Sequence, residues 1–239
     1  MGTLPHPEAF VRWFRQAAPY VHAFRGRTFV IGFGGELVAE RARFVSFVHD
    51  LNLLAALGIR LVLVHGARPQ IDAEMRAKGL RSRFARGLRV TDAASLVAVK
   101  HAAGVLRVEI EALLSQGLPN SPMAGARIRV ASGNYITARP LGVLHGTDFQ
   151  FTGEVRKGDG AAIARHLEAG ELVLVPHIGY SPTGEVFNLS WEDVAESVAL
   201  ALKADKLLLL TDKLPTSRKG EPLHELTARV RAESAQFHA

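Results

Sequence analysis

The sequence contains no cysteine and no long hydrophobic run. The first absence excludes disulfides, thiol nucleophiles and cysteine-ligated zinc. The second argues against a membrane partner, because a spanning helix needs about 20 apolar residues and the densest run is only Leu207–Leu210. The first residues, Met1–His6, lack the apolar segment of a signal peptide and the myristoylation pattern. We therefore expect a cytoplasmic protein.

Aromatic residues are few, at 7% of the chain, whereas basic residues outnumber acidic ones by 29 to 23. The resulting charge of +6 raises the question of nucleic-acid binding. However, the densest basic cluster, residues 76–89, contains Phe84 as its one aromatic residue, and a platform for single strands needs several stacked rings. We interpret this cluster as a solvated loop with one or two anion-binding arginines, and we expect no nucleic-acid partner.

Short apolar segments alternate with longer segments of helical periodicity in these 239 residues. The predicted strands are residues 28–31, 59–64, 127–130, 135–138, 172–175 and 206–210, with a hairpin over 149–155. The predicted helices are residues 7–21, closed by Pro19, then 42–57, one after the turn at 65–69, and 92–116, 159–170 and 190–204. Apolar strands separated by helices are typical of a mostly parallel sheet covered on both faces. The pattern predicts an α/β fold, a three-layer αβα sandwich.

In such a sheet, ligands bind beyond the carboxyl ends of the strands. Three segments should lie there: residues 32–35, residues 65–69 and Thr211–Asp212. Gly34 and Gly35 let backbone N–H groups approach an anion closely, although a Gly-Gly turn alone is more often only structural. Neither a dinucleotide fingerprint nor a Walker loop is present. Two such loops at one edge favour a shared anionic ligand.

Few other residues suggest chemistry. Arg89, just before the predicted helix cap Asp92, is suited to holding a carboxylate, although an ordinary surface arginine is an equal alternative. Glu192 and Asp193 open a predicted helix, where acidic residues by default stabilise the helix dipole. The sequence contains no Gly-x-Ser-x-Gly elbow and no His-Glu-x-x-His motif, so we predict neither a serine hydrolase nor a metal site.

With these residues laid out, the chain resembles the amino-acid kinase family and, within it, the N-terminal domain of bacterial N-acetylglutamate synthases. The matching segments follow the family's order over residues 8–226. They are FR (14–15), PY (19–20), FRGRTFV (24–30), LGIRLV (57–62), HGARPQID (65–72), LRVTD (88–92), SGNY (132–135), RPLGV (139–143), GEV (153–155) and FNL (187–189). The resemblance implies the amino-acid kinase fold.

The chain departs from the kinase pattern at the residues that handle phosphate. Acetylglutamate kinases carry Lys-x-Gly-Gly at the first loop, and Gly32 stands at the lysine position. Phosphoryl transfer depends on positioned positive charge, which glycine does not supply. The resemblance therefore implies a degenerate kinase-type ligand site. Its members would be Gly32, Gly34, Gly35, Gly66, Ala67, Arg68, Arg89, Asn188, Glu192 and Asp212.

The resemblance also implies a regulatory role, with L-arginine as the allosteric effector. In the synthases, acetyl-CoA donates an acetyl group to L-glutamate, the first step of arginine biosynthesis, in a C-terminal acetyltransferase domain. That domain is absent from this chain, so we expect no catalytic residue and no bound cofactor here. We expect a helix and arm over residues 1–26, followed by a truncated kinase-like domain over 27–239. A free-standing arginine sensor remains an alternative, and an active acetylglutamate kinase is disfavoured by Gly32.

In the arginine-sensitive branch of this family the N-terminal helix joins subunits into a hexamer, which implies a homo-oligomer here. Phe10, Trp13 and Phe14 give the predicted helix bulky apolar surface, although these rings could instead pack on their own domain. By resemblance, Tyr20 and then Gln16 are the expected positions for bound arginine. Alternatively, Tyr20 is a packed anchor before the first strand.

Overall fold

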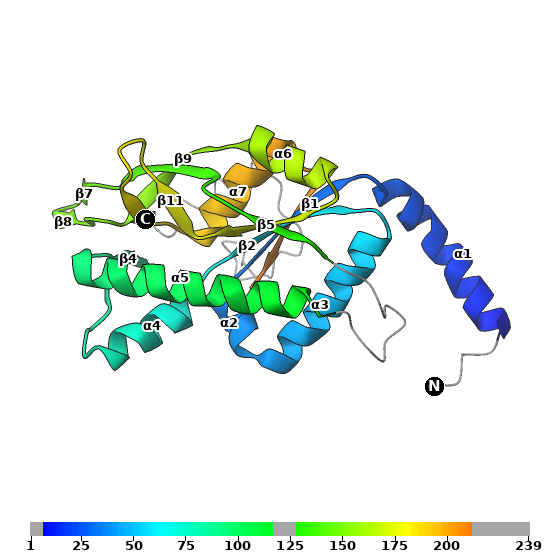
Figure 1. Cartoon of the computed structure of the whole chain (residues 1–239), viewed down its shortest axis with the longest axis horizontal. Helices are drawn as coiled ribbons and strands as arrows, with labels where there is room; N and C mark the ends of the chain where they lie inside the picture. The colour runs from blue at the N-terminus through cyan, green and yellow to red at the C-terminus, as the bar shows by residue number, and fades with distance from the viewer. Residues whose placement is uncertain (1–6, 117–127, 212–239) are drawn as a thin grey trace, which may run out of the picture.

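A five-stranded parallel sheet forms the centre of the molecule. The structure is a computed structural model that describes residues 7–116 and 128–211 (Figure 1). The strand order is β13 (Lys206–Leu210), β1 (Thr28–Phe33), β2 (Arg60–His65), β10 (Leu172–Pro176) and β5 (Val130–Ser132). Helices α3 (Arg41–Ala56) and α5 (Ala93–Leu114) cover one face, and α6 (Gly160–Glu168) and α7 (Trp191–Leu202) cover the other (Figure 1). The predicted three-layer α/β sandwich is confirmed.

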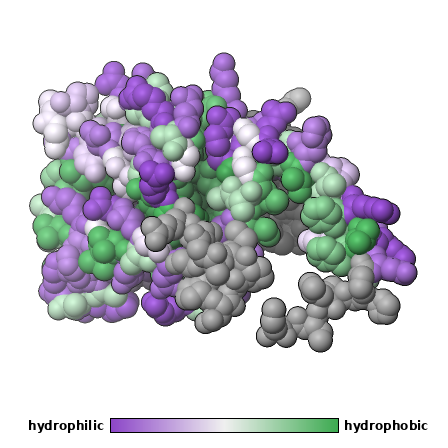
Figure 2. Space-filling model, turned by 45° about the vertical axis from the view of Figure 1, so that its right-hand side comes forward, coloured by the Kyte–Doolittle hydropathy of each residue, from purple (hydrophilic) through white to green (hydrophobic). Residues whose placement is uncertain are grey.

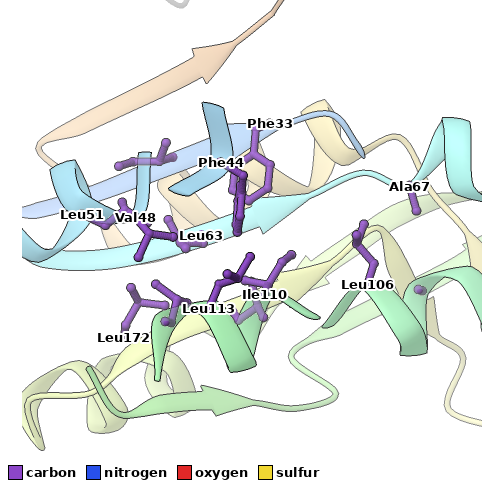
Figure 3. Close-up of a cluster of buried hydrophobic side chains, with 14 of the residues drawn as sticks. Phe33, Phe44, Val48, Leu51, Leu63, Ala67, Leu106, Ile110, Leu113 and Leu172 are labelled. Atoms are coloured by element: carbon purple, nitrogen blue, oxygen red, sulfur yellow. The ribbon is translucent and has the colours of Figure 1, made fainter. Parts of the chain in front are cut away.

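The central strands are apolar throughout because both of their faces are buried. Alternate residues of β1 point in opposite directions: Phe29, Ile31 and Phe33 pack with α3 and α5, whereas Val30 packs with α6 and α7. Figure 3 shows the first of these clusters, in which side chains of α3 and α5 meet Leu63 of β2. The sheet therefore has two separate cores, and its carboxyl edge is left to hold polar groups.

A second, mixed sheet lies beside the first. Its order is β12 (Val186–Asn188), β11 (Ile178–Tyr180), β6 (Ile136–Pro140) and β9 (Gly153–Gly158). Strands β6 and β9 pair antiparallel, and the hairpin segment predicted over 149–155 overlaps β9 only at residues 153–155. Two short hairpins are formed by β3 (Arg83–Ala85) with β4 (Leu88–Val90), and by β7 (Val143–Leu144) with β8 (Thr147–Asp148). The first lies in the predicted basic loop, and its turn residues Arg86 and Gly87 both have positive φ, at 51° and 77°.

Local signals predicted the helix starts better than the helix ends. Asp92 accepts a hydrogen bond from the Ser95 N–H (2.8 Å), and Ser190 accepts one from the Asp193 N–H (3.3 Å), so both predicted caps are confirmed. Helix α1 (Pro7–Phe24) runs past Val21, and the prediction that Pro19 closes it is wrong. Proline removes one intrahelical hydrogen bond without ending the helix. The helix predicted over 42–57 is α3, which is preceded by the short α2 (Gly35–Ala39), and α4 (Arg68–Ala77) follows β2.

Helix α1 projects from the body (Figure 1), and contacts around its C-terminal end, the base of the helix, hold it to the sheet. The Nη2 of Arg60 donates to the carbonyl of Gly26 (2.7 Å), and the Gly26 N–H donates to the carbonyl of Gly58 (2.8 Å). Lys206 Nζ lies 4.3 Å from the ring centroid of Phe24. Asp205 accepts hydrogen bonds from the Thr28 N–H and from Arg27. In the described ranges, no helix is long and apolar enough to cross a membrane.

Candidate ligand site at the carboxyl edge of the sheet

The two predicted glycine loops meet at the carboxyl edge. Strands β1 and β2 are parallel neighbours, and the Gly66 N–H donates to the carbonyl of Phe33 (2.8 Å). A Cβ on Gly35 would lie 2.9 Å from the Cα of Ala67, so the loops are in close contact. Helices α2 and α4 begin directly after these turns, which brings the positive ends of their dipoles to the edge. The edge therefore has the geometry that binds ligands in doubly wound sheets.

The indole of Trp191 lies on the α7 side of this edge. A Cβ on Gly32 would lie 2.8 Å from Trp191 Cζ3, and a Cβ on Gly66 would lie 2.6 Å from Trp191 Cδ1. The ring therefore spans the ends of β1 and β2, over two positions that have no side chain. Trp191 is the first residue of α7, directly after the Ser190 cap. Glycine at 32 leaves room for this ring.

A buried network of hydroxyl and amide groups joins the end of β4 to Thr152 and to β12. Thr152 Oγ1 donates to the carbonyl of Arg89 and lies 3.0 Å from Thr91 Oγ1. The Thr91 N–H donates to Thr152 Oγ1 (3.1 Å), and Asn188 Nδ2 donates to Thr91 Oγ1 (3.0 Å). Asn188, predicted by resemblance, is thus 7% exposed and engaged with the chain's own hydroxyl groups.

Arg89 is buried, at 6% exposed, and the carboxylate that it contacts belongs to Asp72. Its Nη2 donates to Asp72 Oδ1 (2.8 Å), its Nη1 donates to Ser82 Oγ (2.6 Å), and its guanidinium lies 4.7 Å from the Phe84 ring centroid. Burial by itself raises the pKa of Asp72, but hydrogen bonds from Ser82 and Arg89 and the charges of Arg89 and Arg68 hold it below its usual value. Arg68 also lies 4.7 Å from the same ring.

Two fully buried histidines lie side by side where β2 and β10 end. The ring centroids of His65 and His177 are 6.2 Å apart, in an edge-to-face arrangement. Burial lowers the pKa of His65 to about 4. Burial, with the neighbouring charges of His65 and Arg89, lowers the pKa of His177 to about 3. Among the described residues, His65 Nε2 and both ring nitrogens of His177 have no hydrogen-bond partner. Both imidazoles are therefore neutral at pH 7.

The structure divides the predicted site residues into groups. Gly32, Gly34, Gly35, Gly66, Ala67 and Arg68 lie at the edge, and Glu192 accepts a hydrogen bond from Ser190 there (2.8 Å). Asp212 lies outside the described residues. In residues 7–116 and 128–211, no group of three His, Asp or Glu side chains is placed to hold a metal ion. Sequence reasoning missed Trp191, His177 and Thr152, since no local motif connects them to the edge.

Tyr20 and Gln16 lie apart from the edge, on α1. Tyr20 is 68% exposed, so it is not a packed anchor, contrary to the alternative interpretation of its role. Gln16 lines an open groove of about 630 Å³ together with Glu8, Val11, Arg12 and Arg15. The described lining residues all come from α1, and Tyr20 is not among them. Guanidinium, carboxylate and amide groups thus share one face of this helix.

The architecture agrees with one family. The family model described as the amino acid kinase family matches residues 27–214. The chain belongs to the amino acid kinase family. A carbamate kinase from Giardia lamblia bound to AMP-PNP, 14% identical with a TM-score of 0.62 over 89% of this chain and 82% of that chain, has the same fold.

Relatives narrow the resemblance to acetyltransferases. The chain is similar to an amino-acid acetyltransferase of Ralstonia nicotianae, 53% identical over 87% of this chain and 46% of the relative. It is similar to another of Ectopseudomonas mendocina, 54% identical over 84% of this chain and 46% of the relative. The structure of N-acetylglutamate synthase from Neisseria gonorrhoeae complexed with coenzyme A and L-arginine superposes with a TM-score of 0.81 at 41% identity, over 96% of this chain and 54% of that chain. The chain spans about half the length of these proteins.

Proposed function

We propose that this chain is the arginine-sensing, kinase-inactive regulatory domain of an N-acetylglutamate synthase, which acetylates L-glutamate with acetyl-CoA. The observation that carries the proposal is the 41% identity, over nearly the whole chain, to a synthase solved with coenzyme A and L-arginine. In this proposal the chain comprises an arm over residues 1–26 and a kinase-like domain over 27–239, and acetyl-CoA binds in a domain outside it.

Kinase inactivity is supported by the charges at the edge. The first lysine of the sequence is Lys78, whose Nζ pairs with Glu74 (2.6 Å). Arg89 is paired with Asp72, and Arg68 stacks on Phe84. Within residues 7–116 and 128–211, the first loop therefore carries no lysine and the Arg89 guanidinium is already paired with a carboxylate, whereas positioned positive charge dominates catalysis of phosphoryl transfer.

The experiment that tests kinase inactivity measures ADP release by the 239-residue chain supplied with N-acetylglutamate and MgATP. We expect no turnover above the rate without protein. Turnover near 1 per second or faster, the ordinary range for kinases, would contradict this part of the proposal.

The acetyltransferase assignment is tested on the full product of the gene that encodes this sequence. We expect release of CoA from acetyl-CoA when L-glutamate is present, and slower release when L-arginine is added. The 239-residue chain alone should release none. A full gene product that forms no N-acetylglutamate would overturn the assignment.

For the effector we propose α1, with Tyr20 and Gln16 as arginine contacts. Arginine needs acceptors for its guanidinium and donors for its carboxylate. The α1 face with Glu8, Arg12 and Gln16 carries both kinds of group. Calorimetry on the full gene product should show weaker arginine binding in Tyr20→Ala and Gln16→Ala. Tyr20→Phe removes only the hydroxyl, so its affinity shows whether the ring or the hydroxyl of Tyr20 contacts arginine. Unchanged affinity in a folded Tyr20→Ala protein would remove Tyr20 from the site.

We also propose that α1 joins copies of the chain into a hexamer. Phe10, Trp13 and Phe14 are 43%, 63% and 59% exposed, so these rings do not pack on their own domain. Figure 2 shows hydrophobic side chains beside hydrophilic ones at the right-hand end, where α1 projects. Sizing of the protein with and without residues 1–21 tests this proposal. An oligomer that survives the deletion would refute it.

A further inference from the structure

The side chain of Trp191 occupies an unusual position for an indole. Its five-membered ring lies over Gly66 and its six-membered ring lies over Gly32, at the ends of two adjacent parallel strands. A Cβ on Gly32 would also come within 3.1 Å of Ala195 and Leu209, so the ring, α7 and β13 enclose the position together. Any side chain at residue 32 would have to displace the indole.

The indole therefore lies where a ligand of this architecture would lie. In doubly wound sheets ligands bind beyond the carboxyl ends of the strands, against glycines that allow close approach. Helix α4 begins at this edge, its N-cap residue Ala67 makes no side-chain capping bond, and its first turn carries no acidic residue. Backbone N–H groups at such a helix start attract phosphate. Trp191 closes the side of the edge that faces α7.

We propose that Trp191 is a built-in plug, whose indole sterically excludes phosphate-bearing ligands from the edge between β1 and β2. This proposal rests on the kinase inactivity put forward above. It deepens that inactivity by naming Trp191 as the residue that excludes phosphate-bearing ligands. A long side chain at residue 32 and the indole of Trp191 would compete for the same space. The absence of a lysine at residue 32 and the presence of the indole are therefore linked.

An alternative role for Trp191 is ordinary packing against the second core. Partly buried apolar side chains, including Trp191, do pack against that cluster. The two roles predict different effects of removing the ring. A packing residue leaves a destabilised protein that binds nothing new, whereas a plug leaves an open pocket with the shape of the indole.

The test is ligand binding to the 239-residue chain with Trp191→Ala, by equilibrium dialysis with MgADP as the probe. We expect MgADP to bind at least about tenfold more tightly than to the wild-type chain, a difference that dialysis resolves easily. Free indole should compete with MgADP in the variant and raise its melting temperature, because it refills the same space. Trp13→Ala, which removes the chain's other tryptophan from exposed α1, is the matched control and should bind MgADP like wild type.

Two further variants keep the test decisive. Trp191→Phe shortens the ring and, if Trp191→Ala does not fold, should show an intermediate gain in MgADP affinity. Trp13→Phe leaves Trp191 as the sole tryptophan, and its fluorescence should stay unchanged on addition of MgADP because the plug is in place.

The outcomes separate the plug from the proposed function. A folded Trp191 variant that binds MgADP no more tightly than wild type overturns the plug, while a wild-type chain that remains unable to phosphorylate N-acetylglutamate leaves the proposed function intact. A wild-type chain that turns over MgATP contradicts the kinase-inactive assignment and the plug together.

Discussion

The buried pair His65 and His177 predicts a loss of stability in mildly acidic solution. Both pKa values are lowered in the folded state, to about 4 and about 3, from 6.5. The unfolded chain therefore takes up protons first as the pH falls. The stabilisation from the neutral pair is complete above pH 6.5 and is lost progressively as the pH falls toward the folded-state values.

The magnitude can be calculated from these pKa values. At pH 5 each histidine is about 97% protonated in the unfolded chain, but about 9% (His65) and 1% (His177) in the folded protein. Each contributes a loss of about 2 kcal/mol in the free energy of unfolding relative to pH 8, so the pair contributes about 4 kcal/mol. A typical domain has a total stability of about 5–15 kcal/mol, so the effect is large.

The assay is urea unfolding followed by circular dichroism between pH 8 and pH 5. Acidic groups with lowered pKa values, such as Asp72 and Asp205, lose their contribution only below this range. His177→Asn should remove about half of the pH-dependent loss, and His22→Asn, which changes an exposed histidine of α1, is the matched control. Equal pH slopes for wild type and His177→Asn would refute the assignment of the acid sensitivity to this pair.

Substitutions at three other positions test the packing around the edge and the contacts at the base of α1. Gly66→Ala should destabilise the protein by about 1–3 kcal/mol through overpacking against the indole. The same substitution should destabilise a Trp191→Ala variant much less. Additive losses in a urea double-mutant cycle would show that residues 66 and 191 are not in contact. Arg89→Met should lower the free energy of unfolding by about 2–4 kcal/mol because Asp72 loses its partner. Arg89→Lys should recover only part of this loss because lysine lacks the planar guanidinium. Full recovery by lysine in the same urea assay would contradict the observed geometry. Asp205→Ala should lower the free energy of unfolding because the Thr28 and Arg27 hydrogen bonds are lost. Asp205→Asn keeps an acceptor for the Thr28 N–H and should lower it less. Equal stabilities of the two variants would argue against the Thr28 contact.

Signals that act over a few residues predicted the fold well. The caps Asp92 and Ser190 bond to residues three positions ahead, and the apolar runs of β1 and β2 identify a sheet buried on both faces. The glycine loops were likewise found where parallel strands end. The end of α1 was predicted wrongly, because a proline weakens a helix without determining whether it stops.

Contacts between residues that are distant along the chain could not be predicted from the sequence. Arg89 was recognised as suited to a carboxylate, but nothing local indicates that Asp72, on α4, supplies it. Gly32 was interpreted as a missing lysine, whereas the residue that fills its space lies on α7. His177 follows β10 without any motif and becomes notable only beside His65. Each of these pairings arises from sheet order and helix packing.

Because α1 is held to the body only near its C-terminal end in the described residues, it can act as a lever arm that amplifies movement at that end. With 18 residues it is about 27 Å long, and its link to the body is fastened through Gly26, Arg60, Lys206 and Asp205. A rotation of about 10° at this base would move the far end by about 5 Å, roughly the pitch of one helical turn. Asp205 and Lys206 lie three and four residues after the end of α7 at Leu202, and the first residue of α7 is Trp191. A small displacement at the sheet's carboxyl edge therefore has a mechanical route, along α7, to the position of the far end of α1.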